Sequence, residues 1–440
     1  MGKKMLKGLF VLVVLLMGAA LAVGILFAGP APAGANEVLA KAPALTDRDG
    51  NFNTNILSDT SDWLTDRFFG RQWLISMNNF LTGTLFGNSA TDDVILGEDG
   101  WLYYASTLPD YTGTAPMTDR ELFMAANNLQ LMADYCAENG RQFAFMIAPN
   151  KNSLYPEQMP NYGVSAETKN AQRLQETLAA LDVAYIDLFT LFDRPETLYF
   201  AHDSHWNSRG AALGADGINQ AFGVQSNYFG DPFAESIVHQ GDLYEMLYPA
   251  FQDNERDPVY GGQLVFEYTS GATKPDSITL LTQGQGSRSL LCYRDSFGNL
   301  LYPYLADSSS DARFSRSTSY DLTQPGDHVL IELVERNLSY LYTYLPVMPA
   351  SARQLELPAA GGAVALSVQA AKTPESTQLV KGTLTEETDA NSGIYIVCDG
   401  GIYEAFCLAN GGFGAYVPAD QNPTGVAFYQ NGALCYRTAE

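Results

Sequence analysis

The sequence has 440 residues, enough for two domains or one large domain with an addition, and 46% of the residues are hydrophobic, as in ordinary globular proteins. This composition excludes a disordered chain. The formal charge is −24, and a surface this acidic repels phosphate backbones and anionic lipid. Nucleic acid is therefore not expected as a partner, and neutral polymers or small molecules fit better.

The N-terminus predicts a membrane segment. MGKKMLK carries three lysines and precedes an uncharged apolar run from Leu9 to Phe27. A run of about 20 apolar residues matches the hydrocarbon core of a bilayer, and lysines before it favour a cytoplasmic N-terminus. We expect residues 1–35 to be a signal anchor of a single-pass protein in the cell membrane, with the rest extracytoplasmic. Ala33-Gly34-Ala35 favours an alternative, secretion after cleavage of a signal peptide. A buried core helix is a third interpretation.

Residues 36–60 are rich in Ala, Pro, Gly and Asn and predict a tether. Apolar residues at helical spacing in 61–87 predict one amphipathic helix or two. The stretch VILGEDGWLYY (94–104) then predicts a hairpin. Thr118 and Glu121 form a capping box before a helix that Gly140 ends.

From there, strands and helices alternate. Continuous apolar runs predict strands at 143–149 and 183–189, and a helix is expected between them, from about 165 to 181. TLYFAHDSHWN (197–207) predicts a short strand running into a loop, with a helix capped by Asn207 or Ser208 after it. SLLCYRDSFGNLLYPYLA and HVLIELVERNLSYL each predict a strand, a turn and a helix.

This alternation predicts an α/β domain over residues 61–350, with a parallel sheet covered by helices on both faces. In such a sheet, the ligand site lies outside the carboxyl ends of the strands. Residues 351–440 differ, because they show alternating apolar residues and the Asn-Gly turns 410–411 and 431–432. They predict a small all-β module, with carbohydrate binding as a candidate role.

The five cysteines are an odd number without a CxxC pair, so we expect no zinc site, and no cofactor is predicted.

Two short stretches carry groups suited to acyl transfer. RDSFG (294–298) follows an apolar strand, and a serine on a strand-to-helix turn is raised above the sheet beside backbone N–H groups that stabilise an oxyanion. A serine needs a base, commonly a histidine oriented by an aspartate. AHDSHWN (201–207) holds two of the chain's four histidines, and Asp203 can orient either His202 or His205.

Other interpretations compete with this one. Asp295 or Ser296 could simply cap a helix. Asp203 could cap a turn while His205 packs on Trp206. His202, Asp203 and His205 could also ligate a divalent metal, although the sequence offers no obvious further ligand cluster.

The order of VILGEDGWLYY, FMIAPNKNSLYPEQMP, AHDSHWNSRGA, GDLYEML (241–247), YRDSFGNLLYPYLA and HVLIELVERNL resembles the DHHW family and its relatives, the AlgX/AlgJ-type polysaccharide O-acetyltransferases. The resemblance extends over residues 60–345, and the C-terminal module lies outside it. It implies an SGNH-hydrolase-like, flavodoxin-like fold. It also implies that Ser296 is the nucleophile, His205 the base and Asp203 the residue that orients the base.

The chain departs from the family pattern at two positions. Ser204 stands where the name-giving motif has a second His, which touches none of these three roles. Arg294 stands where a Gly-Asp-Ser pattern has Gly, so Arg294 is a candidate substrate contact.

Several residues are candidates for oxyanion stabilisation or substrate binding. The backbone N–H of Ser296 is the first oxyanion donor, and Asn150 or Lys151 could supply a side-chain donor or act as a structural cap. Arg336 and Asn337 are candidate lining residues. Trp206, Tyr103 and Tyr104 could stack on sugars, although core packing is the other role open to them.

The predicted function is therefore an extracytoplasmic O-acetyltransferase that forms an acetyl-serine and acetylates an exopolysaccharide or cell-wall glycan. The resemblance implies a membrane-bound acyltransferase as the source of acetyl groups. An acetylesterase with the same three residues and a catalytically silent glycan-binding scaffold are the alternatives.

Overall fold

The computed structural model describes residues 3–28, 39–47, 49–164, 168–234 and 237–440. Its main element is a seven-stranded sheet in the order β4-β3-β11-β9-β10-β8-β7. These strands are Tyr185–Ile186 (β4), Gln142–Ala148 (β3), His328–Val334 (β11), Arg288–Tyr293 (β9), Ser309–Ser315 (β10), Thr279–Gly284 (β8) and Phe266–Tyr268 (β7).

The centre of this sheet is parallel, as predicted. Neighbours from β4 to β10 run parallel, whereas β8 is antiparallel to β10 and β7 to β8. Only residues 285–287 join β8 to β9. Two parallel strands need a long crossover connection, so a connection this short makes the two strands run in opposite directions. The sheet is thus mixed, with two antiparallel strands that the sequence did not predict.

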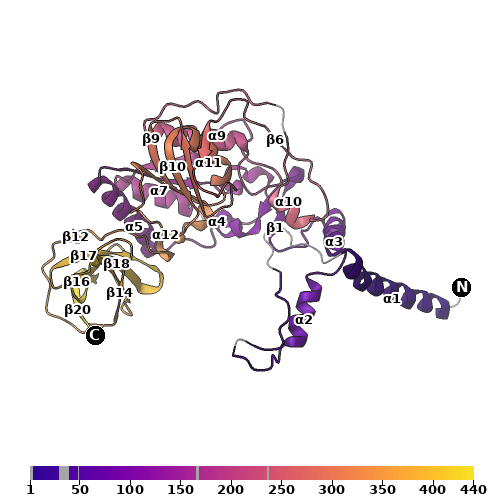
Figure 1. The fold of residues 1–440 in the computed structure, drawn as a ribbon, viewed down its shortest axis with the longest axis horizontal. Helices are drawn as coiled ribbons and strands as arrows, with labels where there is room; N and C mark the ends of the chain where they lie inside the picture. The colour runs from indigo at the N-terminus through magenta and orange to yellow at the C-terminus, as the bar shows by residue number, and fades with distance from the viewer. Residues whose placement is uncertain (1–2, 29–38, 48, 165–167, 235–236) are drawn as a thin grey trace.

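Helices cover both faces of the sheet (Figure 1). On one face, Phe145 and Ile147 of β3 pack with α5 (Asp119–Glu138) and α7 (Asn170–Ala180). On the other face, Ala144 and Met146 pack with helices that follow in the chain. Those helices are α9 (Ser208–Ala221) and α11 (Gly298–Asp307). The alternating direction of side chains along β3 explains why its run is apolar throughout.

Two predicted helix caps are confirmed. Thr118 accepts from the backbone N–H of Glu121 in a reciprocal capping box that starts α5. Asn207 accepts from the N–H groups of Arg209 and Gly210 and starts α9, so it is the cap rather than Ser208.

The expected strand 183–189 is only partly correct. β4 covers Tyr185–Ile186, and a short helix, α8 (Leu188–Leu191), follows because the Asp187 side chain accepts from the N–H of Thr190. The expected strand in 197–207 is a single bridge between Tyr199 and Trp206, outside the sheet. The loop therefore folds back on itself.

In the part of the chain that the structure describes, three α-helices precede Val94: α1 (Lys3–Ala28), α2 (Ile56–Thr65) and α3 (Arg71–Phe86). Gly70, with φ of 77°, separates α2 from α3, so the predicted amphipathic stretch forms two helices. Within the described residues, no helix is both long and apolar enough to cross a membrane. The proposed cleavage site lies outside the described residues, and the signal anchor stays a prediction.

Shorter elements lie around the carboxyl end of the sheet. The predicted hairpin is confirmed, with Val94–Leu96 (β1) antiparallel to Leu102–Tyr104 (β2). The remaining elements of this part are Leu108–Thr112 (α4), Lys151–Leu154 (α6), Ile237–Val238 (β5), Asp242–Leu247 (α10), Arg256–Asp257 (β6) and Tyr340–Thr343 (α12).

The C-terminal residues form an all-β module, as predicted, in a nine-stranded sheet. Asn410-Gly411 and Asn431-Gly432 adopt positive φ, as the predicted turns require. The strands are Ala352–Arg353 (β12), Ala363–Val364 (β13), Leu366–Ala370 (β14), Thr377–Thr383 (β15), Ile394–Cys398 (β16), Gly401–Cys407 (β17), Gly412–Pro418 (β18), Pro423–Gln430 (β19) and Ala433–Ala439 (β20).

The module shares a hydrophobic core with the α/β domain. Leu129 and Met132 of α5 belong to the same cluster of buried residues as Phe406 and Val417 of the module. The fully buried Asn128 side chain donates to the carbonyls of Leu341 and Cys407, each at 2.9 Å, and accepts from the N–H of Cys407 at 3.1 Å. One amide thus joins α5, α12 and β17.

Replacing Asn128 with Ala is expected to lower the free energy of unfolding by about 2–4 kcal/mol, because three buried backbone groups lose their partner. Chemical denaturation followed by circular dichroism measures this change. Asn127→Ala on the same helix is the control, since the Nδ2 of Asn127 has no partner among the described residues. Equal stability of the two variants would contradict the prediction.

Candidate active site

The turn that carries Ser296 is fixed at both ends. It follows β9, and the N–H of Asp295 donates to Oε2 of the buried Glu332 on β11 at 3.0 Å. The Asp295 carboxylate accepts from the N–H of Phe297 at 2.9 Å and from that of Val334 at 2.8 Å. Asp295 is therefore the residue that holds the turn against the end of β11, which leaves Ser296 exposed to the loop opposite.

Ser296, His205 and Asp203 come together as the sequence predicted. The Nε2 of His205 lies 2.8 Å from Oγ of Ser296, and its Nδ1 lies 2.7 Å from Oδ1 of Asp203. The same Oδ1 accepts from the backbone N–H of His205 at 2.9 Å. The ring of Phe297 packs against His205 with centroids 4.7 Å apart. These distances match the hydrogen-bond chain that a nucleophile, a base and an orienting acid require.

Charge stabilises the hydrogen bonds between Ser296, His205 and Asp203. Burial alone would raise the pKa of Asp203, but the charges and hydrogen bonds of His205 and His239 hold it well below its usual range. Burial would lower the pKa of His205, but Asp203 and then Asp242 raise it above its ordinary value. An ionised Asp203 therefore favours a proton on His205, which is what a general base must accept.

The Lys151 side chain holds the loop 200–205 in place through hydrogen bonds to its backbone carbonyls. Its Nζ lies 3.1 Å from the carbonyl oxygen of Phe200, 3.0 Å from that of Ala201 and 2.6 Å from that of Asp203. An ammonium group has three hydrogens, so these bonds use all of them. Lys151 is buried and positions the loop, and it is not available as an oxyanion donor.

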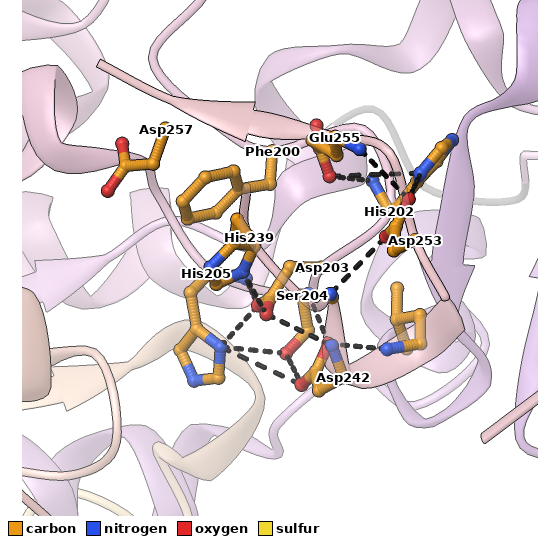
Figure 2. A network of polar contacts seen from close by, with 12 residues as sticks. Phe200, His202, Asp203, Ser204, His205, His239, Asp242, Asp253, Glu255 and Asp257 are labelled. Carbon is orange, nitrogen blue, oxygen red and sulfur yellow. Dashed lines mark hydrogen bonds and ion pairs between the residues drawn. The ribbon is translucent and has the colours of Figure 1, made fainter. Parts of the chain in front are cut away.

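The adjacent histidine lies in a separate cluster. His202 Nδ1 is 2.7 Å from Asp253, and Glu255 accepts from the N–H of His202 at 2.8 Å (Figure 2). Asp253 and Glu255 thus fix the start of the loop. The ligand atoms of His202 group with these two acids, whereas Asp203 and His205 group with Asp242, so the metal-site interpretation that joined His202, Asp203 and His205 does not fit this geometry.

Ser204, which departs from the family motif, links the loop to α10. Its N–H and hydroxyl donate to the two oxygens of Asp242, at 2.7 and 2.6 Å. The N–H of Asp242 in turn donates to Oδ2 of Asp203 at 3.0 Å. A Cβ on Gly241 would lie 2.4 Å from the carbonyl oxygen of His202, so only glycine allows α10 to approach this closely.

The other predicted substrate residues have different positions. Trp206 is fully buried and packs edge-on against Phe297, so it cannot stack on a sugar. Arg294 is buried and donates to Asn299, at 2.6 Å, and to the carbonyl of Pro275, so it supports the turn, and it also lines the cavity beside Ser296. Arg336 lies over the rings of Phe297 and Tyr104, 5.7 and 5.4 Å from their centroids, close to the site.

Asn150 and the two tyrosines line the same end of the sheet. Asn150 is fully buried, and its Oδ1 has no partner in the part of the chain that the structure describes. Its N–H donates to Glu335 at 2.8 Å. Tyr103 is buried, as core packing requires, whereas Tyr104 is half-buried beneath Arg336.

A cavity of about 240 Å³ opens beside the nucleophile. It lies between the Ser296 turn, the end of β11 and the loop after β10. Asn337, a predicted lining residue, forms part of its wall. The other wall residues are Arg294, Asp295, Ser296, Arg316, Ser317, Thr318, Tyr320, Glu332, Leu333 and Tyr340.

One family model matches part of the chain. Residues 94–260 match the model of the family described as the SGNH hydrolase-like domain of the acetyltransferase AlgX. The predicted family resemblance is therefore confirmed. The matched segment contains Asp203 and His205 but ends before Ser296. No curated protein matches the chain.

Solved structures similar to this chain have low identity. The O-acetyltransferase domain of Pseudomonas putida AlgJ is 17% identical over 56% of this chain and 91% of its own, with a TM-score of 0.37. Bacillus cereus PatB1 with a sulfonyl adduct is 20% identical over 56% and 97%, with a TM-score of 0.42. Pseudomonas aeruginosa AlgX is 12% identical over 82% and 98%, with a TM-score of 0.38.

Sequence reasoning missed several residues of the candidate site. His239, Asp242, Asp253 and Glu255 lie 34–50 residues after His205. Only Asp242 had a signal, because it belongs to the GDLYEML stretch of the family resemblance. The others follow no helix or strand period, so nothing in the sequence linked them to AHDSHWN.

Replacing Lys151 with Met is expected to slow the reaction of Ser296 with a fluorophosphonate probe by about 10- to 100-fold, because the loop that holds Asp203 loses its clamp. Thermal stability should fall as well, since three carbonyls lose a donor. Probe labelling and thermal unfolding measure the two effects. Lys381→Met, at an exposed position on β15, is the control. Wild-type labelling of Lys151→Met would show that the clamp is not needed.

Proposed function

We propose that this protein is an extracytoplasmic O-acetyltransferase that carries acetyl groups on Ser296 to hydroxyls of an exopolysaccharide or cell-wall glycan. The observation that carries the proposal is the hydrogen-bond chain from Ser296 through His205 to Asp203. The match to the AlgX acetyltransferase domain supports polysaccharide O-acetylation in general. In this proposal, the N-terminal segment anchors the enzyme in the membrane, and a membrane-bound acyltransferase supplies the acetyl groups.

The first half of the reaction loads the serine. Oγ of Ser296 attacks the carbonyl carbon of the acetyl donor while Nε2 of His205 takes the hydroxyl proton. The oxyanion forms beside the N–H of Ser296 at the start of α11. When the intermediate collapses, the donor oxygen leaves with the proton from His205, and acetyl-Ser296 remains.

The second half transfers the acetyl group. A glycan hydroxyl attacks acetyl-Ser296 and gives its proton to Nε2 of His205. The second tetrahedral intermediate releases the acetylated glycan, and Oγ of Ser296 recovers the proton. If water replaces the glycan hydroxyl, the same steps release acetate, so the acceptor alone distinguishes transferase from esterase.

A fluorophosphonate probe is expected to form one adduct, on Ser296, in the full-length protein. Ser296→Ala should abolish the adduct, and His205→Ala should slow its formation by about 10³-fold or more. Mass spectrometry of peptides locates the adduct. Ser289→Ala is a matched control, since Ser289 lies on the same strand before the turn. Absence of any adduct would favour the silent scaffold.

Transfer is tested with an acetyl ester as donor and a panel of neutral oligosaccharides as acceptors. The proposal expects acetylated sugar, detected by mass spectrometry, that depends on Ser296. Free acetate without acetylated sugar, even with glycan isolated from the organism's own envelope as acceptor, would identify an esterase.

The pH dependence should follow His205, whose pKa Asp203 raises above the ordinary value of a histidine. The base must be neutral to accept a proton, so kcat/KM should rise with pH through this pKa and then level off. Asp203→Asn removes the charge that raises the pKa, so this limb should move to lower pH while the plateau falls by about 10³- to 10⁴-fold. A pH profile of ester hydrolysis measures both. An unmoved limb would show that Asp203 does not set the basicity of His205.

A further inference from the structure

His239 occupies a position that the reaction steps above do not use. It follows β5, and its backbone N–H donates to the carbonyl of Glu255 at 2.9 Å. Its ring stacks on Phe200, with centroids 3.9 Å apart and planes 7° from parallel. Its Nε2 lies 2.9 Å from Oδ2 of Asp203, whereas Nδ1 of His205 contacts the other carboxylate oxygen, Oδ1 (Figure 2).

Asp203 therefore lies between two imidazole rings. Oδ1 accepts hydrogen bonds from the ring and the backbone N–H of His205. Oδ2 accepts them from the ring of His239 and the backbone N–H of Asp242. An ionised carboxylate only accepts hydrogen bonds, so both rings present an N–H to it. The neutral form of His239 thus carries its proton on Nε2.

We propose that His239 is a positioning residue that holds Asp203 in place and, through its own protonation, sets the pH at which His205 can act as the base. The inference rests on the proposed function, because His205 matters as a base only if Ser296 reacts. The carboxylate that both histidines share carries the effect from one ring to the other.

The charged groups around His239 favour its protonated form. Burial of the ring lowers its pKa, but Asp203, then Asp257 and Glu255, outweigh burial and raise it above the ordinary value. These carboxylates come from three segments packed around the ring: the catalytic loop, β6 and the residues just before β6. His239 thus stays protonated to higher pH than an ordinary histidine, and Asp203 raises the pKa of His205 as well.

The sign of the coupling follows from the shared acid. A proton on His239 offsets part of the negative charge of Asp203, so Asp203 then stabilises a proton on His205 less. Protonated His239 therefore lowers the pKa of His205 and keeps the base neutral at lower pH. Two sites linked in this way titrate as a pair with two apparent pKa values.

Replacing His239 with Gln separates the effect of the hydrogen bond to Asp203 from the effect of the positive charge. Its amide can donate to Oδ2 of Asp203 but cannot be protonated near neutral pH. In His239→Gln, we expect the titration of His205 to move up by about 0.5–1 pH unit, and the acid limb of the pH profile to move with it. His239→Leu also removes the donor, so the plateau rate should fall further, by about 10- to 100-fold.

Histidine-ring NMR of the full-length chain tests the coupling without reference to activity. With only four histidines, selective ¹⁵N labelling gives few ring signals, and His328→Gln both assigns one signal and serves as the control outside the network. The proposal expects the His205 titration to be shifted in His239→Gln and unchanged in His328→Gln. If His239→Gln does not fold, titration of the wild-type protein decides, because coupled rings give two-step curves.

An unshifted His205 in His239→Gln, or single-step and independent titrations of the two rings in the wild-type protein, would overturn the proposal. Shifted titrations in a protein that neither labels at Ser296 nor transfers acetyl groups would uphold the coupling and reject the proposed function. A changed rate with an unmoved acid limb would reduce His239 to a structural contact.

Discussion

An ionised carboxylate enclosed by protein is costly unless every lone pair has a donor, and Asp203 meets this condition with four. No single element can supply four donors to one side chain. The loop, α10 and the segment after β5 must therefore converge on it. The neighbouring contacts follow from this requirement: Lys151 gathers the loop carbonyls, and Gly241 lets α10 come close.

The serine side of the site obeys a related rule. Asp295 holds two backbone N–H groups, and its own N–H binds Glu332, whose pKa burial and then Asp295 raise well above the usual value. The raised pKa favours the neutral form of Glu332, which adds no second negative charge beneath the turn. The acid groups on this side thus hold the backbone of the turn that carries Ser296. The residues proposed for proton transfer, His205 and Asp203, lie on the opposite loop.

Local signals predicted the framework and the three central residues. Apolar runs indicated β3, β9 and β11, and hydroxyl or amide caps indicated α5 and α9, because these patterns depend on neighbours a few residues away. The three residues were predictable because Asp203 and His205 lie only two positions apart in the chain and a family resemblance linked them to Ser296. Three features were not predictable, because each depends on contacts between distant segments. They are the antiparallel edge of the sheet, the roles of Lys151 and Trp206, and the position of His239.

The shared core of the α/β domain and the β module determines how the protein responds to proteolytic cleavage. Residues 354–361 are mostly exposed coil between β12 and β13. A protease that cut there would not release the strands that follow, because apolar side chains of α5 pack with those of the module and Asn128 bonds across the boundary. The two fragments would remain one particle in solution, and a nicked enzyme would still hold its active site together.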